Sequence, residues 1–512
     1  MKAFLMYKDQ DFDLQRQLPP NEQALTQDLE LNTLFNAMAL GDKFLFEVAK
    51  KAVLSGLNDL DTIIYRQNIL KDCLKNSSIV RDIYEFVVES IESKKKSWYG
   101  IFSKYPSSIL YNSVAMLQIY VSMLKKLRNI ADEHADKFES EGFTAFFAML
   151  NKELGDEFFV SIQNHLRELK FRDGVLISAE LREGNKGTHY ILRKPQDKKQ
   201  SWLQRIFAKK TPAYTIQISD RDESGAKALS ELKDRGINLV ANALAQSTDH
   251  ILSFFNMLRT ELAFYVGCLN LHGQLAKKGK PTCFPLPMAR DERRHSFKGL
   301  YDVCLALILE QRTVGNDVNA DNTDLVMITG ANQGGKSTFL RSIGLSQLMI
   351  QCGMFVPAES FCSNVCEGLF THYKREEDAT MKSGKLDEEL SRMSDIVDNI
   401  TSNSMVLFNE SFAATNEREG SEIARQIICA LLEKRIKVFF VTHLYEFAHG
   451  FYDKKMGNAI FLWAERQTDG GRTFKVIEGE PLQTSYGVDL YKGIFGTDNY
   501  NHYHSLSTDN DH

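Results

Sequence analysis

The stretch Leu325-Val-Met-Ile-Thr-Gly-Ala-Asn-Gln-Gly-Gly-Lys-Ser-Thr-Phe-Leu340 decides how the rest of the chain is interpreted. An apolar run comes first, glycines follow, and an apolar helical pattern begins near Lys336. The residues from Gly330 to Ser337 fit the spacing G-x-x-x-x-G-K-[ST], in which glycines let successive backbone N–H groups point into one concavity. We therefore expect a phosphate-binding loop, with the positive end of the following helix dipole directed at the anion.

Each part of this loop has an expected role. Lys336 supplies a positive charge for the β- and γ-phosphates of a nucleotide, and the Ser337 hydroxyl is an expected Mg²⁺ ligand. The nucleotide contacts are expected from Gly330, Ala331, Asn332, Gln333, Gly334, Gly335, Lys336, Ser337 and Thr338. The alternative is a glycine-rich structural turn, but the β-rich run before the loop and the apolar helix after it favour nucleotide binding.

Length and composition limit the class of protein. The chain has 512 residues, of which 43% are apolar and 25% charged, and its net charge is −5. This length is too great for one hydrophobic core, so about two to four domains are expected. The charge balance argues against a surface coated with nucleic-acid-binding groups but allows a local basic patch.

Cysteine usage and the apolar runs indicate the compartment. The 8 cysteines are scattered, which favours reduced thiols over disulfides or a metal site. The apolar run at the amino terminus is too short for a signal peptide, and no run approaches the length of a membrane span. We expect a cytoplasmic protein with no membrane partner.

The periodicity of apolar residues changes along the chain and predicts five segments. Residues 1–170 carry apolar residues at three- and four-residue steps and are expected to form a helical core domain. Residues 171–225 have strand-like composition, punctuated by Gly and Pro, and are expected to form a small β insertion. A lever helix and connector are expected over 226–290, an α/β ATPase domain over 291–497 and a disordered tail over 498–512.

Several elements are predicted in detail. Helices are expected over Leu31–Ala39, Lys43–Leu54, Thr62–Leu74 and about Ser107–His134. The last of these has an apolar stripe that we expect to be core, formed by Leu110, Val114, Leu117, Val121, Leu124 and Leu127. Strands are expected over 175–180, 189–192 and 213–218. A helix from about Ile237 to Lys278 would span roughly 60 Å and could carry a displacement along its length.

The connection from Arg193 to Lys210 is basic and contains aromatic residues. It has seven basic residues against one acid. Such a loop could follow a phosphate backbone, and its candidate DNA contacts are Lys198, Lys199, Arg205, Lys209 and Lys210. The alternative is a solvated loop, which is the usual role of a charged run.

Two later strands end in polar residues typical of ATP hydrolysis. The apolar run that starts at Ser404 ends in Asn409 and Glu410. In ATPases of this design the first residue of the pair orders the Mg²⁺ shell and the second orients or deprotonates the attacking water. Asn409 keeps an oxygen acceptor but lacks the negative charge. Either hydrolysis is slow, or the metal depends more on Ser337 and the phosphates.

The third strand of this half ends at His443. The carboxyl ends of strands are where α/β sheets place ligands, so His443 is positioned to sense a γ-phosphate. The alternative, considered for this residue alone, is a loop histidine that faces solvent.

Together these motifs resemble the MutS family of DNA mismatch-repair ATPases. The resemblance is carried, in order and spacing, by residues 329–338, 352–358, 409–420, 441–443 and 484–488. It is strong from about 291 to 495 and weaker upstream, where 61–67 and the long helix are similar to the family's core and lever. The resemblance implies an ABC-type P-loop ATPase that works as a homodimer, with nucleotides between the subunits and ATP turnover coupled through lever helices to a DNA clamp.

The family pattern also implies residue roles. Lys336 and Ser337 would bind phosphate and Mg²⁺, Asn409 would occupy the second metal position, Glu410 would be the catalytic carboxylate and His443 the switch histidine. The residues implied to face the partner subunit are Ser383, Thr415, Asn416 and Glu419. The helix over 388–400 resembles the segment that reaches the other subunit's γ-phosphate.

The chain departs from the family at several places. Asn409 stands where the family usually has Asp, and residues 412–414 stand where it has Gly-Arg-Gly. The first 150 residues contain no Phe-x-Glu mismatch reader, and only a short β insertion corresponds to the clamp. We therefore expect a short MutS-like member without the mismatch-recognition domain, which engages structured or branched DNA rather than single mismatches.

The expected function is that of a DNA-dependent ATP hydrolase that uses ATP and Mg²⁺ in mismatch repair or a related repair or recombination process. The alternative is a nucleotide-gated scaffold with little hydrolysis that recruits protein partners, which Asn409 and the modest charge favour. A chromosome-maintenance ATPase would need long coiled-coil arms, for which the roughly seventy residues between the phosphate loop and Asn409 are too few.

Overall fold

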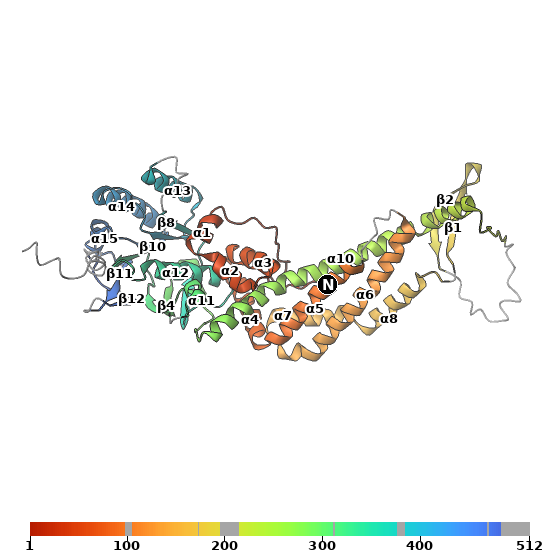
Figure 1. Ribbon diagram of the computed structural model, residues 1–512, viewed down its shortest axis with the longest axis horizontal. Coiled ribbons are helices and arrows are strands. Elements are labelled where there is room, and N and C mark those ends of the chain that lie inside the picture. The colour runs from red at the N-terminus through yellow and green to blue at the C-terminus, as the bar shows by residue number, and fades with distance from the viewer. Residues whose placement is uncertain are drawn as a thin grey trace, which may run out of the picture. The chain divides into compact units, whose positions relative to one another are not determined.

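The computed structural model describes residues 1–97, 105–172, 174–194, 214–310, 313–375, 384–467 and 471–482 (Figure 1). The chain divides into two compact units. Unit 1 comprises Met1–Phe4 and Ser78–Glu261, and unit 2 comprises Leu5–Ser77 and Leu262–His512. The long helix α10 (Glu223–Lys277) contributes residues to both units.

Unit 1 is mainly helical. Its helices, besides the first part of α10, are α5 (Ser77–Ser97), α6 (Pro106–His134), α7 (Glu141–Glu153) and α8 (Asp156–Glu168), with a short 3-10 turn at Ala135–Lys137. All six members of the predicted stripe on α6 are buried, so the prediction that it is core is confirmed. By length and composition α6 could also cross a membrane. Its buried stripe, and the packing of Tyr120 against Phe255 at 6.0 Å between ring centroids, favour a core helix instead.

A two-stranded hairpin follows α8. Its strands β1 (Leu176–Arg182) and β2 (Lys186–Arg193) pair antiparallel around a short turn at Glu183–Asn185. The strand predicted over 213–218 is wrong for its described part, because 214–218 form no strand and leave Tyr214 and Ile216 exposed. Strand propensity depends on a pairing neighbour, which this run does not find. The five predicted DNA contacts between 198 and 210 lie outside the described residues.

The long helix begins earlier than predicted, at Glu223 rather than near Ile237. The Asp222 carboxylate accepts the N–H of Gly225 at 2.8 Å, which satisfies a donor of the first turn. Glycines at 225 and 236 weaken the helical pattern in the sequence and conceal this start. At 1.5 Å per residue the helix is about 80 Å long.

Unit 2 contains a six-stranded sheet with the order β12-β11-β6-β10-β9-β8. The strands are β6 (Leu325–Gly330), β8 (Leu369–Tyr373), β9 (Met405–Asn409), β10 (Lys437–Val441), β11 (Ala459–Arg466) and β12 (Arg472–Glu478). Only β12 runs antiparallel to its neighbour. The central strands β6, β9 and β10 are mostly apolar because a parallel sheet is covered on both faces.

Helices cover both faces of this sheet (Figure 1). On one face α12 (Lys336–Gln351) packs on β9 and β10. On the other, α13 (Lys385–Asn399), α14 (Glu417–Glu433) and α15 (Tyr445–Tyr452) share a core with the strands. The chain therefore has a carboxyl-terminal α/β part and a mostly helical part with a small hairpin, as the sequence predicts in outline.

The remaining elements of unit 2 surround this layer. A four-stranded sheet has the order β3-β7-β4-β5, formed by β3 (Leu286–Met288), β4 (His295–Leu300), β5 (Asn316–Asn319) and β7 (Ser360–Asn364). The helices are α1 (Glu22–Asp28), α2 (Leu31–Ala39), α3 (Lys43–Leu54), α4 (Leu60–Lys75) and α11 (Val303–Ile308), with a 3-10 turn at Arg290–Glu292. The predicted bounds of α2 and α3 are confirmed, and α4 begins two residues early because Asp59 caps it.

Arg66 on α4 is a buried charge that joins three segments of unit 2. Only 1% of the residue is exposed. Its Nε donates to the backbone oxygen of Met6 at 2.8 Å, and its Nη1 donates to that of Cys352 at 3.4 Å. The guanidinium also lies 4.6 Å from the centroid of the Tyr7 ring, within the range of a cation–π contact.

Replacing Arg66 by Ala is expected to lower the free energy of unfolding of unit 2 by about 2–4 kcal/mol, because the variant leaves a cavity and two buried carbonyl groups without a donor. Lys71→Ala, at an exposed position of the same helix, is the control and should change stability by less than about 0.5 kcal/mol. Thermal and urea unfolding of both variants measure the difference. Equal stability of Arg66→Ala and wild type would contradict this role.

Candidate functional site

The glycine-rich loop between β6 and α12 has the backbone that the sequence predicts. Gly330 ends β6 at a φ of +106°, and Gly335 precedes the helix at a φ of +89°. A side chain at position 330 would also meet the backbone nitrogen of Ala464 on β11, 2.9 Å from the added Cβ. Both the backbone angle and the close approach therefore require glycine at Gly330.

Lys336, the first residue of α12, is buried beneath this loop, with 4% of the residue exposed. Its Nζ donates to the backbone oxygens of Gly330 and Ala331, each at 2.9 Å. Burial lowers the pKa of Lys336 to about 8, and the nearby carboxylate of Glu410 opposes this effect. The ammonium group is thus charged at neutral pH, and it is held by carbonyl groups that an anion could replace.

Ser337 and Asn409, the two predicted metal ligands, are in direct contact. The Ser337 hydroxyl donates to Oδ1 of Asn409 at 2.9 Å. Both offer hard oxygen atoms of the kind that Mg²⁺ prefers, so the pair fits this metal. Neither carries a charge, and among the described residues no group of three or more His, Cys, Asp or Glu side chains could hold a metal ion. A divalent cation here would need negative charge from a bound ligand.

Glu410 and His443 form a second polar pair at the same edge of the sheet. Oε1 of Glu410 lies 2.9 Å from Nε2 of His443. The hydrogen bond from His443 lowers the pKa of Glu410 more than burial raises it, so the carboxylate is ionised at neutral pH. The Glu410 N–H also donates to the backbone oxygen of Val441 on β10 at 2.8 Å. This hydrogen bond joins the ends of β9 and β10. The arrangement offers an ionised proton acceptor in a fixed position.

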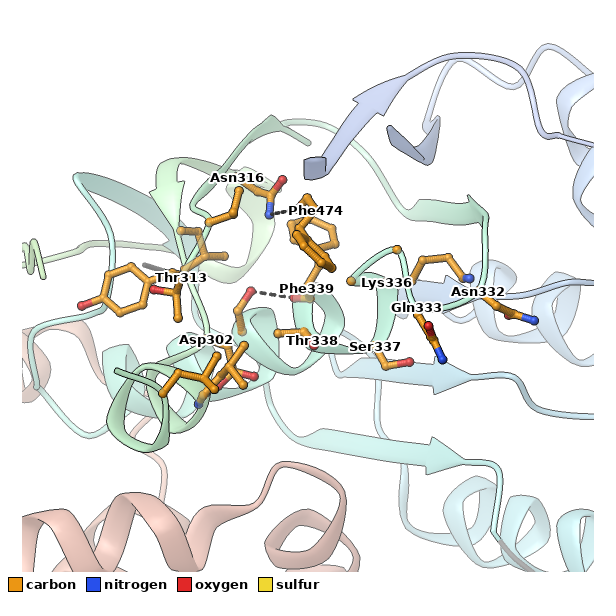
Figure 2. Close-up of a pocket in the computed structure, with 18 of the residues that line it drawn as sticks. Asp302, Thr313, Asn316, Asn332, Gln333, Lys336, Ser337, Thr338, Phe339 and Phe474 are labelled. Carbon is orange, nitrogen blue, oxygen red and sulfur yellow. Dashed lines mark hydrogen bonds between the residues drawn. The ribbon is translucent and has the colours of Figure 1, made fainter. Parts of the chain in front are cut away.

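Lys336, Ser337 and Glu410 border a cavity of about 400 Å³. The loop residues Asn332, Gln333 and Lys336 lie at one end of it in Figure 2, and Thr313 lies at the other. The lining also includes the apolar side chains of Leu305 and Leu309. Its volume and mixed lining fit a small molecule with an anionic part and a flat apolar part.

Two family models match the chain. The model of the MutS2 N-terminal domain matches residues 58–278, and the model of MutS domain V matches residues 326–495. The second match contains the whole glycine-rich loop together with Asn409, Glu410 and His443. The chain belongs to the MutS family.

Curated MutS-family relatives align with part of the chain. It is 29% identical to the DNA mismatch repair protein MutS of Clostridium kluyveri over 208 residues, and 31% identical to that of Clostridium tetani over 201. It is 34% identical to that of Thermotoga maritima over 184 residues. The alignments cover 39%, 38% and 36% of this chain but 24%, 23% and 23% of the relatives. The matched part is therefore less than a quarter of each relative's length.

In this MutS-family chain, sequence reasoning missed the side of the cavity formed by β5 and β12. The Asn316 amide donates to the backbone oxygen of Phe474 at 3.4 Å, and its Oδ1 accepts the N–H of Val476 at 2.8 Å. Arg472 on β12 donates to Oε1 of Gln333 in the loop at 2.7 Å. These partners are more than a hundred residues apart in the chain, and no local pattern indicates the pairing.

Four residues are expected to face a second MutS-family subunit. Within this chain, those that the structure describes lie at the start of α14. Oδ1 of Asn416 accepts the N–H of Glu419 at 3.0 Å, and the Thr415 hydroxyl donates to the Glu419 carboxylate. Asn416 and Glu419 are exposed, so a partner could still reach them. The fourth residue of this set, Ser383, lies outside the described residues. The helix expected over 388–400 is α13, which begins three residues earlier.

Proposed function

We propose that this MutS-family chain binds and hydrolyses ATP in an ABC-type P-loop domain. The observation that carries the proposal is that Lys336, Ser337 and Glu410 line one cavity at the carboxyl edge of the sheet, with Asn409 bonded to Ser337 and His443 bonded to Glu410. A phosphate-binding loop, two metal-binding oxygens and an ionised carboxylate are the groups that phosphoryl transfer to water requires.

Binding uses the two ends of the cavity. Backbone N–H groups of residues 330–338 and the Lys336 ammonium group bind the phosphates, and the apolar lining from Leu305 and Leu309 accommodates the base. The oxygens of Ser337 and Asn409 would hold Mg²⁺, which in such sites neutralises charge on the phosphates. Because Asn409 is neutral, the phosphates supply most of the negative charge around the metal. Hydrolysis is slow because the protein holds the metal only weakly.

Hydrolysis depends on Glu410. Its ionised carboxylate accepts a proton from the attacking water, and His443 holds that carboxylate at 2.9 Å and responds to the γ-phosphate. In this proposal ATP closes a homodimer through the exposed start of α14, with Thr415, Asn416 and Glu419 facing the other subunit. The long helix α10 acts as a lever to the hairpin, which belongs to a small clamp-like insertion.

The proposed substrate of this movement is DNA in mismatch repair or a related repair or recombination process. Support comes from the curated relatives, which are named DNA mismatch repair proteins, and from the basic run of Lys198, Lys199, Arg205, Lys209 and Lys210. Basic side chains in such a run bind phosphates without reading bases. We therefore expect structured or branched DNA to be preferred over a single mismatch.

The test is a binding panel of homoduplex, mismatched, branched and single-stranded DNA, with and without ATP, at two salt concentrations. Affinity for homoduplex and mismatched duplex should be equal, and affinity for branched DNA higher. Replacing Lys198, Lys199, Lys209 and Lys210 by Ala should flatten the salt dependence, because each lost phosphate contact reduces the slope by about 0.9. Lys125→Ala with Lys126→Ala, at exposed positions of α6, is the control. A strong preference for one mismatch would contradict the proposal.

A second candidate function is favoured by Asn409. Without a carboxylate at this position, the chain could use ATP to switch dimer geometry and recruit protein partners with almost no turnover. The Glu410→Gln comparison described in the Discussion separates this scaffold from the ATPase.

A further inference from the structure

The segment that follows β9 has a strained backbone. Glu410 and Phe412 both have positive φ angles, +55° and +63°, although neither is glycine. Such conformations are unfavourable for residues other than glycine and persist only where the surroundings impose them. Because Glu410 is the proposed proton acceptor, the contacts that impose this backbone also determine where its carboxylate lies.

Two contacts hold the backbone of Phe412. Oε2 of Glu389 on α13 accepts the Phe412 N–H at 2.8 Å. At the other side, the carbonyl oxygen of Phe412 lies against Gly420 of α14, where an added Cβ would be only 2.3 Å from that oxygen. The Phe412 side chain is fully buried and stacks on the ring of His372 at 5.2 Å. This residue is therefore clamped between α13 and α14.

His372 on β8 makes a second link between α13 and the same segment. Its Nε2 lies 2.9 Å from the backbone oxygen of Glu389, and its Nδ1 lies 2.7 Å from the Ser411 hydroxyl. A carbonyl oxygen only accepts, so Nε2 carries the proton. Burial lowers the pKa of His372 to about 4, so the ring is neutral at physiological pH and this tautomer is retained. The Ser411 hydroxyl also donates to the backbone oxygen of His372 at 2.6 Å, so Ser411 is held beside a residue that itself bonds the α13 backbone.

The buried carboxyl group of Glu389 lowers the stability of the fold, which suggests a functional role. It is fully buried, and its Oε1 has no hydrogen-bond partner among the described residues. Burial raises the pKa of Glu389, while the Phe412 N–H opposes this effect. A buried carboxyl group with one unsatisfied oxygen destabilises the fold, whereas an apolar side chain would fill the same space without that cost.

We propose that Glu389 is a positioning residue for ATP hydrolysis, which sets the position of Glu410 by holding the N–H of Phe412 from α13. This inference rests on the proposed function. The hydrogen bond makes the placement of the proposed proton acceptor depend on α13, a helix on the opposite face of the sheet from α12. A displacement of α13 would therefore move Glu410 relative to the phosphate loop.

Three variants test this role in the full-length protein. Glu389→Leu fills the same space but cannot accept the Phe412 N–H. Glu389→Gln keeps an amide oxygen that can accept it. Met393→Ala, at a buried position one turn later on α13, disturbs the same helix but leaves the Glu389 carboxylate and its hydrogen bond from Phe412 in place. Each protein is measured for ATP affinity, for kcat and for hydrogen exchange of the peptide over residues 408–416.

Glu389→Leu should lower kcat roughly 10- to 100-fold, because a displaced catalytic group loses its alignment while the binding site stays intact. Its ATP affinity should stay within about twofold of wild type. Hydrogen exchange of the 408–416 peptide should become faster in Glu389→Leu and stay close to wild type in Glu389→Gln. The kcat of Glu389→Gln and of Met393→Ala should lie within about threefold of wild type.

The inference is overturned if Glu389→Leu keeps the wild-type kcat, or if Met393→Ala loses as much activity as Glu389→Leu. It is also overturned if the leucine variant loses ATP affinity and kcat together. These outcomes differ from failure of the proposed function, in which wild type itself releases no phosphate from ATP.

Discussion

Replacing Glu410 by Gln should lower the kcat of ATP hydrolysis by roughly 10²- to 10⁴-fold, the usual contribution of a positioned general base. The amide has nearly the shape of the carboxylate and can accept the hydrogen bond from His443, so the site should keep its geometry. It cannot accept a proton from water at neutral pH. The affinity for ATP should stay within about threefold of wild type, because Glu410 is expected to act after binding.

Phosphate release at saturating ATP, with affinity measured separately, gives both quantities. Glu446→Gln on α15 is the matched control, because it removes an exposed carboxylate close in the chain to His443. That variant should hydrolyse ATP at the wild-type rate. If wild type and Glu410→Gln release phosphate equally slowly, the chain is a nucleotide-gated scaffold rather than an ATPase.

Replacing Lys336 by Ala should weaken ATP binding by roughly 10- to 100-fold, the usual value of one hydrogen-bonded charge. The side chain already lies under the loop, where its Nζ bonds the oxygens of Gly330 and Ala331. In the complex these carbonyl partners are exchanged for phosphate oxygens, which are stronger acceptors. Isothermal titration with ATP and with a nonhydrolysable analogue measures the loss, and unchanged affinity would remove the phosphate-binding role of the loop.

The same lysine predicts a pH dependence of binding. Burial lowers the pKa of free Lys336 to about 8, and contact with phosphate would raise it in the complex. The affinity for ATP is therefore highest below pH 8. It falls as pH rises through that value, by up to about tenfold per pH unit. Lys336→Arg keeps its charge throughout this range and is the control, because its affinity should not decline between pH 7 and about 9.5.

Local patterns determined a large part of this fold. The bounds of α2 and α3 follow from apolar residues at three- and four-residue steps, and Asp59 marks the start of α4. The six buried positions of α6 follow from the same rule. These features depend on residues within one or two turns of each other, so a sequence contains the information directly.

Predictions that needed a distant partner were less successful. The run over 214–218 has strand composition but finds no strand to pair with. The start of α10 depends on Asp222, and the glycines that follow it conceal the helical pattern. The hydrogen bond from Phe412 to Glu389 joins the segment after β9 to α13. No local pattern in the sequence reveals that these two elements lie in contact.

The candidate site shows the same division. By itself the sequence determined that a glycine loop, Asn409, Glu410 and His443 each follow an apolar strand, because loop chemistry and strand composition are local properties. Only the tertiary structure decided that Ser337 meets Asn409 and that Glu410 meets His443, each at 2.9 Å. The reason is the strand order β6-β10-β9, which comes from packing of whole strands and helices rather than from any neighbouring residues.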